Sequence, residues 1–198
     1  IKDDPVVYDL AIAGGGMAGT CAAVAALRTG SRVVLIQDRP VLGGCNSSEV
    51  RVGLGGWAQW APYPNVGRVV TAIGPIMGGG GVYPGDWYED KRKENIFRLS
   101  PGNQYKLVLN ERVYAVERDP DDPSKITAYI AHNARTGRET RYRARLFADC
   151  TGDAVIARMM GAEVMYGREA RTHFNETIAP EKADRQVMGM SVQWLSRR

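Results

Sequence analysis

The stretch AIAGGGMAGTCA, residues 11–22, places three glycines in a row and a fourth three positions later. Gly14, Gly16 and Gly19 thereby fill a GxGxxG pattern. In such a pattern the first glycine permits a tight turn, the second lets the backbone approach a pyrophosphate, and the third lets a helix pack closely on a strand. Glycine-rich turns are common, so the flanking segments must decide whether this one binds phosphate.

Those flanking segments predict a βαβ unit. Residues 6–13 (VVYDLAIA) and 32–37 (RVVLIQ) are short apolar runs typical of buried strands, and the alanine-rich residues 17–29 predict the helix between them. The N–H groups at the start of that helix, at Met17 and Ala18, would face a phosphate together with the positive end of the helix dipole. In this context the pattern predicts a dinucleotide phosphate site.

The end of the second predicted strand is where an acidic residue usually holds a ribose hydroxyl, about 20 residues after the first glycine. Here that position is Gln37, and Asp38 follows it. The Gln37 amide oxygen and the Asp38 carboxylate are both acceptors, so the assignment stays open between them. Arg39 lies close by, but no arginine replaces the acid, and we expect no 2′-phosphate.

Farther along, the chain predicts an irregular middle and an antiparallel excursion. Residues 38–56 read as a loop, and residues 57–104 as irregular apart from a short helix around 87–97. Alternating stretches then predict strands, and the CTGDAVIARMMGA segment predicts a strand end, a turn and a helix. The expected strands are 105–109 and 112–118 (as one strand or two), 125–133 and 140–148, with a turn at 120–124.

The composition is that of an ordinary globular chain. The 198 residues are 44% hydrophobic and 24% charged, with a net charge of +4 that is too mild to indicate nucleic acid binding. We expect the basic residues between 112 and 145 to form a solvated sheet face. No apolar run approaches the ~18 residues of a membrane helix, so no membrane partner is expected.

Three cysteines are too few for a disulfide framework and favour a reducing compartment. We therefore expect a cytoplasmic location. No signal peptide is visible, but the sequence begins at Ile1 rather than Met, so a removed leader stays open. The oligomeric state, including a homo-oligomer, also stays open.

Two segments resemble a known family. The QDRPVLGG…SSE portion that follows the glycine pattern is similar to the FAD-dependent oxidoreductases, a branch of the glutathione-reductase-like flavoprotein superfamily. The segment LFADCTGDAVIARMMGAEVMYGREARTHFNETIAPEKAD, residues 146–184, resembles a later motif of the same branch. The resemblance covers residues 8–51 and about 105–194, and it implies FAD as cofactor.

The implied fold is an α/β, Rossmann-like FAD-binding domain with a parallel central sheet and an antiparallel β crossover, covering residues 1–198. The resemblance also implies binding residues. Glycines after a strand permit backbone contact, and Thr and Asp cap a following helix. The implied contacts are Gly43 and Gly44 at the pyrophosphate, Cys45, Asn46 and Ser48 toward the flavin, the Val113 backbone at the adenine, and Thr151, Gly152 and Asp153 in a second turn.

The sequence departs from the family in two places, which indicates either that this protein has lost a helix or that part of a larger protein is absent. Family members usually carry a helix between the NIFR…GN region and the strand that resembles LVLNERV, whereas here Asn103 leads into that strand almost at once. The sequence also stops at Arg198, where family members continue into a substrate domain and a final flavin-contacting motif. We expect that domain to be absent or only begun after about residue 160, and the 198-residue piece alone to be inactive.

The sequence does not identify catalytic residues. Cys45 has no second cysteine about five positions away, so we expect a buried structural thiol rather than dithiol chemistry. His173 lies near Glu169 and Glu176 in the sequence, an arrangement that suits a general base but also suits a plain solvated segment. His132 reads as a surface residue. Ser47 and Ser48 lack a histidine partner, and the spacing of histidines and cysteines predicts no metal site.

The leading hypothesis is a FAD-dependent oxidoreductase that acts on a small organic substrate. One alternative is a dinucleotide-binding module without a redox role. Another is an inert piece of a larger flavoenzyme that cannot hold FAD by itself.

Overall fold

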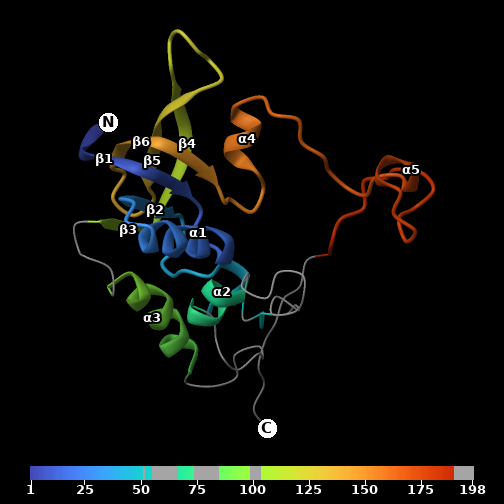
Figure 1. Ribbon diagram of the computed structural model, residues 1–198, viewed down its shortest axis with the longest axis horizontal. Helices are drawn as coiled ribbons and strands as arrows, with labels where there is room; N and C mark the ends of the chain where they lie inside the picture. The colour runs from blue at the N-terminus through green and yellow to red at the C-terminus, as the bar shows by residue number, and fades with distance from the viewer. Residues whose placement is uncertain (51, 55–66, 74–84, 99–103, 190–198) are drawn as a thin grey trace.

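The computed structural model describes residues 1–50, 52–54, 67–73, 85–98 and 104–189, and it is built on one six-stranded sheet (Figure 1). The strands lie in the order β3-β2-β1-β6-β5-β4. Their bounds are β1 Lys2–Ala13, β2 Val33–Gln37, β3 Tyr105–Leu109, β4 Glu111–Arg118, β5 Ile126–Asn133 and β6 Glu139–Asp149. The sheet is mixed, with a parallel and an antiparallel part.

The parallel part confirms the predicted βαβ unit. β1 pairs in parallel with β2 and β6, and β2 pairs in parallel with β3. Every residue of β2 is buried, as its continuous apolar sequence indicates for a strand covered on both faces. The connecting helix α1 (Met17–Arg28) buries Ala23, Val24 and Leu27 and ends just before Gly30, which has a φ of +85°.

The antiparallel part confirms the predicted crossover. β4 pairs antiparallel with β5, and β5 pairs antiparallel with β6. Residues 105–118 form two strands, because Asn110 turns the chain between them with a φ of +60°. β3 and β4 are thus one residue apart in sequence yet at the two ends of the strand order. The crossover folds back over the parallel strands, so Tyr129 and Ala131 share a core cluster with Val34 and Ile36.

β1 begins at Lys2 rather than at the expected residue 6. The polar start KDDP hides the strand in the sequence, because its partners are charged residues of β6. Asp3 forms ion pairs with Arg141 and Arg143, at 2.6 and 2.7 Å. The register shifts between Asp3 and Val7, an irregularity that accommodates Pro5 within a strand.

Two helices pack against α1 on the same side of the parallel strands and lie below α1 in Figure 1. Helix α3 (Gly85–Arg98) extends the predicted helix, and α2 (Gly67–Ile73) was not expected. Ile73 and Phe97 pack into a second core cluster with residues of α1 and β2. Residues 55–66, 74–84 and 99–103, which complete the expected irregular region, lie outside the described residues. No described helix has the length and apolar character needed to cross a membrane.

After β6 a short helix forms and the chain then leaves the sheet. Asp149 fixes the turn, because its carboxylate accepts hydrogen bonds from the Thr151 N–H and hydroxyl and from the Ala157 N–H, at 2.6–3.0 Å. The Val155 N–H donates to Thr151 Oγ1 at 2.8 Å, at the start of α4 (Val155–Met159). Thr151 Oγ1 thus accepts the first N–H of the helix, whereas the N-cap residue itself is Ala154, which makes no side-chain capping bond.

The stretch beyond α4 extends away from the sheet and carries the four-residue helix α5 (Arg171–Phe174) (Figure 1). An ion pair between Arg168 and Asp184 ties its two ends together. Most of its side chains are exposed. This stretch adds little to the core that supports the sheet.

The first prediction concerns Gly19, where a Cβ would lie 1.9 Å from the Gly14 carbonyl oxygen. Because that neighbour is backbone, Gly19→Ala should lower the melting temperature by about 6 °C or more, as severe overpacking does in a chain of this size. Thermal unfolding measures the change. Gly189→Ala adds the same methyl group in open space and is the control. Equal melting of the two variants would show that α1 and β1 are not packed as described.

The second prediction concerns Asp149. Burial alone would raise the pKa of its carboxyl, but hydrogen bonds from Thr151, Ala157 and Ile156 hold the pKa below the ordinary 3.8. A lowered pKa stabilises the fold above pH 3.8, and this stabilisation is lost as the pH falls through the folded-state pKa.

Asp149→Asn should therefore lower the free energy of unfolding by about 1–2 kcal/mol at neutral pH, a value discounted for partial exposure. Urea unfolding at pH 7 and about pH 3 should show a smaller difference from wild type at the lower pH. Asp121→Asn, in the exposed β4–β5 turn, is the control. A difference that does not depend on pH would contradict the role given to the charged carboxylate.

Candidate functional site

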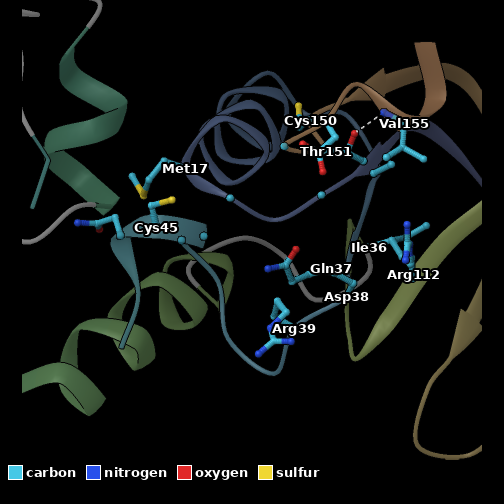
Figure 2. A pocket seen from close by; sticks show the side chains of 18 of the residues that line it. Met17, Ile36, Gln37, Asp38, Arg39, Cys45, Arg112, Cys150, Thr151 and Val155 are labelled. Carbon is cyan, nitrogen blue, oxygen red and sulfur yellow. Dashed lines mark hydrogen bonds between the residues drawn. The ribbon is translucent and has the colours of Figure 1, made fainter. Parts of the chain in front are cut away.

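A groove of about 660 Å³ lies where the carboxyl ends of β1, β2 and β6 meet, the usual place for a ligand in an open parallel sheet. The segment after β1, the segment after β2 and the segment after β6 each contribute one wall. The first residues of β4 contribute a fourth, because β4 starts directly after the carboxyl end of β3. Figure 2 shows Met17 and Cys45 at one end of the groove and Ile36 and Arg112 at the other.

The first wall is the glycine turn after β1. Gly14 has a φ of +96°, and a Cβ there would lie 2.4 Å from the Cys150 carbonyl oxygen. Gly16 differs from both Gly14 and Gly19, because a Cβ on Gly16 would meet nothing within 4 Å. Gly14 thus serves the turn and Gly19 the packing of helix on strand, as the sequence predicted. The face of Gly16 is open toward the groove.

A second glycine turn packs against the first. Gly43 and Gly44 have φ values of +111° and +59°, which favour glycine. Gly43 N–H donates to the Gly15 carbonyl at 2.9 Å, and a Cβ on Gly44 would lie 3.2 Å from Gly16 Cα. The two turns therefore form one continuous backbone surface along the groove.

The side chain of Gln37 holds these turns in place. It is buried, its Oε1 accepts the Gly15 N–H at 2.8 Å, and its Nε2 donates to the Val41 carbonyl at 3.1 Å. Gln37 thus connects the first glycine turn to the loop that leads into the second. Of the two acceptors that the sequence left open for a ribose, the Gln37 oxygen already has a backbone partner, and Asp38 is exposed.

Arg39 next to Asp38 is committed to an ion pair. Its guanidinium donates two-pronged hydrogen bonds to the Glu49 carboxylate at 2.7–3.1 Å. The hydrogen bond and the charge of Glu49 raise the pKa of Arg39. This pair joins the loop after β2 to the residues just beyond the short 3-10 helix at Gly44–Asn46.

The end of the groove near Arg112 is formed by the start of β4. Glu111, Arg112 and Val113 line it, and the Asn110 N–H donates to the Arg39 carbonyl at 3.2 Å. Glu111 is buried and accepts a hydrogen bond from the Tyr142 hydroxyl at 2.8 Å. Val113 was expected at the site. Glu111 and Arg112 were missed because the sequence gave Glu111 no role and placed Arg112 on a solvated face.

The wall after β6 holds Cys150, Thr151, Gly152, Asp153 and Val155. The dashed line in Figure 2 marks the hydrogen bond between Thr151 and Val155. Gly152 and Asp153 are exposed at the groove. The expected second turn therefore lies directly beside the glycine turn after β1, since a Cβ on Gly14 would lie 2.9 Å from the Thr151 nitrogen.

The structure brings most of the predicted site residues together. All of them line the groove except Ala18, Gly19 and Ser48. Ala18 is exposed on α1, Gly19 packs inside the fold, and Ser48 lies beyond the 3-10 helix, where its N–H donates to Asp90 at 3.1 Å. The sequence also missed several lining residues whose types carry no binding signal, namely Ala13, Ile36, Val52, Gly53, Leu54, Cys150 and Val155.

The expectation that Cys45 is buried is wrong. Cys45 is an exposed free thiol, whereas its neighbour Asn46 is 8% exposed. The 3-10 turn reverses the expected pattern, because it directs Cys45 outward and Asn46 inward. Asn46 Nδ2 donates to the Val52 carbonyl at 2.8 Å, while its buried Oδ1 has no partner among the described residues.

The histidines lie outside the groove. His132 and His173 are exposed, as the sequence suggested, and no described residue that lines the groove is a histidine. Among residues 1–50, 52–54, 67–73, 85–98 and 104–189, no cluster of histidine, cysteine and acidic residues has the arrangement of a metal site.

Comparison with solved structures shows the same fold in flavoenzymes. A geranylgeranyl bacteriochlorophyll reductase-like protein from Thermoplasma acidophilum shares 15% identity and a TM-score of 0.56, over 85% of this chain and 45% of that chain. Adenylylsulfate reductase from Archaeoglobus fulgidus shares 16% identity with a TM-score of 0.53, over 77% of this chain and 31% of that chain. The flavin-dependent monooxygenase PieE, solved with FAD and substrate, shares 14% identity with a TM-score of 0.52, over 83% of this chain and 34% of that chain.

The likeness to these structures establishes the fold alone, and the chain spans less than half the length of each. No curated protein matches the sequence. The family model described as FAD dependent oxidoreductase matches residues 9–196, almost the whole sequence. The chain therefore belongs to the FAD-dependent oxidoreductase family, and its cofactor is FAD.

Proposed function

We propose that FAD lies extended along the groove, and that the chain is the cofactor-binding part of an enzyme that transfers a hydride or electrons between the flavin and a small organic substrate. The observation that carries this placement is the open face of Gly16 between two glycine turns. Only at this glycine of the pattern would a side chain point into free space. A backbone surface without side chains is what close contact with a pyrophosphate requires.

The residues at the middle of the groove fit a pyrophosphate. Gly16 is the residue before the first turn of α1, where backbone N–H groups have no partner within the helix. The first turn of α1 contains no acidic residue to repel a phosphate. These N–H groups and the helix dipole attract an anion at the position where Gly43 and Gly44 complete the surface.

The end of the groove near Arg112 suits the adenosine. Asp38 is the exposed carboxylate at the end of β2, so we assign the ribose hydroxyls to Asp38 rather than to Gln37. Val113 would receive the adenine through its backbone, as the family resemblance implies. The groove thus orders the cofactor from adenosine at β4 to flavin at Met17 and Cys45.

The flavin end offers acceptors and apolar contacts rather than an acid or base. The buried Asn46 Oδ1 atom at the groove wall has no hydrogen-bond partner among the described residues, so it would accept an N–H of a flavin ring. FAD supplies the redox chemistry when bound, and the protein binds and orients it. A hydride transfer to flavin needs no protein base, so the absence of a lining histidine in the described groove is compatible with this function.

The third prediction tests the placement of the pyrophosphate. Gly16→Val puts a branched side chain where the backbone meets the cofactor, so the Kd for FAD should rise at least tenfold (about 1.4 kcal/mol or more). The backbone at Gly16 is extended, with φ −62°, so the fold should persist and the melting temperature should change by less than about 4 °C. Flavin fluorescence titration and thermal unfolding provide the two measurements.

The matched control is Ala25→Val, which adds a branched side chain on the exposed face of the same helix. Its FAD affinity should equal that of wild type. Unchanged affinity in Gly16→Val would mean that the glycine turn does not contact the cofactor.

The fourth prediction tests the enzymatic function. The natural full-length protein should be yellow, with absorption near about 450 nm from the flavin chromophore, and an electron donor should bleach it. A folded, colourless protein that fails to bind added FAD would contradict flavin binding. Bound flavin that no donor reduces would instead favour a module without a redox role. FAD titrations of residues 1–198 and of a longer natural chain test whether the shorter piece is inert. If it is inert, FAD should bind to the longer chain and not to residues 1–198.

A further inference from the structure

A lysine that the sequence gave no reason to select lies behind the glycine turns. Lys93 is on α3 and is 1% exposed. Its ammonium nitrogen is buried, and no described residue gives it a hydrogen bond or an ion pair. Lysine is rarely buried to this extent without a partner, because an isolated charge loses its hydration.

The stem of Lys93 packs directly against the second glycine turn. A Cβ on Gly43 would lie 2.9 Å from Lys93 Cε, so the missing side chain of Gly43 makes room for the lysine. Gly43 also forms a bridge with Gly16, the glycine whose face is open to the groove. The lysine therefore stands behind the backbone surface proposed to bind the pyrophosphate.

The surroundings of Lys93 compensate its charge only in part. Burial lowers the pKa of the Lys93 ammonium and outweighs the attraction of Asp90 and Glu89 on the same helix. The Asp90 carboxylate already accepts the Ser48 N–H at 3.1 Å. A buried ammonium without a hydrogen-bond partner costs stability, and an anion from outside the described residues would offset that cost.

Among the described residues that line the groove, none supplies a free positive charge near its middle, where the pyrophosphate is proposed to lie. The acidic lining residues are Asp38, Glu111 and Asp153, and the basic ones are Arg39 and Arg112. Arg39 is paired with Glu49, and Arg112 lies at the far end of the groove (Figure 2). A pyrophosphate brings two negative charges into this setting.

We propose that Lys93 is the counter-charge for the FAD pyrophosphate, and that it acts on the cofactor from behind the Gly43 turn. Lys93 is a positioning residue, since it does not line the groove or contact the reacting atoms. The cofactor and the lysine then stabilise each other, because each supplies the charge that the other lacks. This inference rests on the placement of FAD proposed above.

The fifth prediction uses Lys93→Met in the full chain, a neutral side chain of similar length. Without the cation, the Kd for FAD should rise at least about tenfold, as expected for loss of one partly desolvated charge pair. Without FAD, the variant should melt at a higher temperature than wild type, because a buried unpaired charge has been removed. Fluorescence titration and thermal unfolding of the apoprotein measure the two effects, which have opposite signs.

The control is Lys91→Met on the same helix, where the lysine is partly exposed and pairs with Glu94 at 2.7 Å. This variant should bind FAD like wild type. Lys93→Gln repeats the test with a polar neutral side chain if the methionine variant fails to fold.

Unchanged FAD affinity in the neutral variants would overturn the proposal. A loss of affinity together with a less stable apoprotein would overturn it too, because Lys93 would then only support the fold. Gly16→Val in the same titration separates the two proposals. If Gly16→Val leaves affinity intact, the placement of FAD itself is wrong.

Discussion

Three backbone segments meet at the end of β1 with no room for a side chain between them. A Cβ on Gly14 would collide with the Cys150 carbonyl after β6, and a Cβ on Gly19 would collide with the Gly14 carbonyl. The absence of these two side chains lets α1 start close to β1 and lets β6 end beside it. The groove lies between these elements, so its shape depends on this close approach more than on any single hydrogen bond.

The parts of the fold that the sequence predicts well are those with a local signal. Apolar runs and glycine spacing identified the βαβ unit, and alternating stretches with a turn identified the antiparallel strands, because period and turn chemistry act over a few residues. The family resemblance implied that these strands form the crossover. The sequence did not predict the first residues of β1. Asp3 is stabilised in a strand by Arg141 and Arg143, which lie more than a hundred residues away in sequence. Helix α2 was not predicted, because its seven residues lie between segments rich in glycine and proline.

The site shows the same division. The glycines could be assigned because their backbone roles follow from spacing, but the polar side chains could not. Gln37 and Asp38 were equivalent acceptors until Gly15 and Val41 were seen to occupy the Gln37 amide. Cys45 was expected inside and lies outside. Lys93 sits in a charged stretch that reads as a solvated helix, and its burial arises from packing against Gly43, a contact that local sequence does not encode.

The late position of β6 in the sequence affects how the domain folds while the chain is being synthesised. β1 and β2 pair soon after they are made, since only the α1 connection separates them, whereas Ala13 must wait for Asp149. A chain synthesised from its N-terminus therefore carries β1 with one open hydrogen-bonding edge until β6 has emerged, and such edges invite pairing with other chains. The last wall of the groove forms at the same moment. The cofactor can thus protect the finished domain but not the nascent one, and the most vulnerable period of the protein precedes its first encounter with FAD.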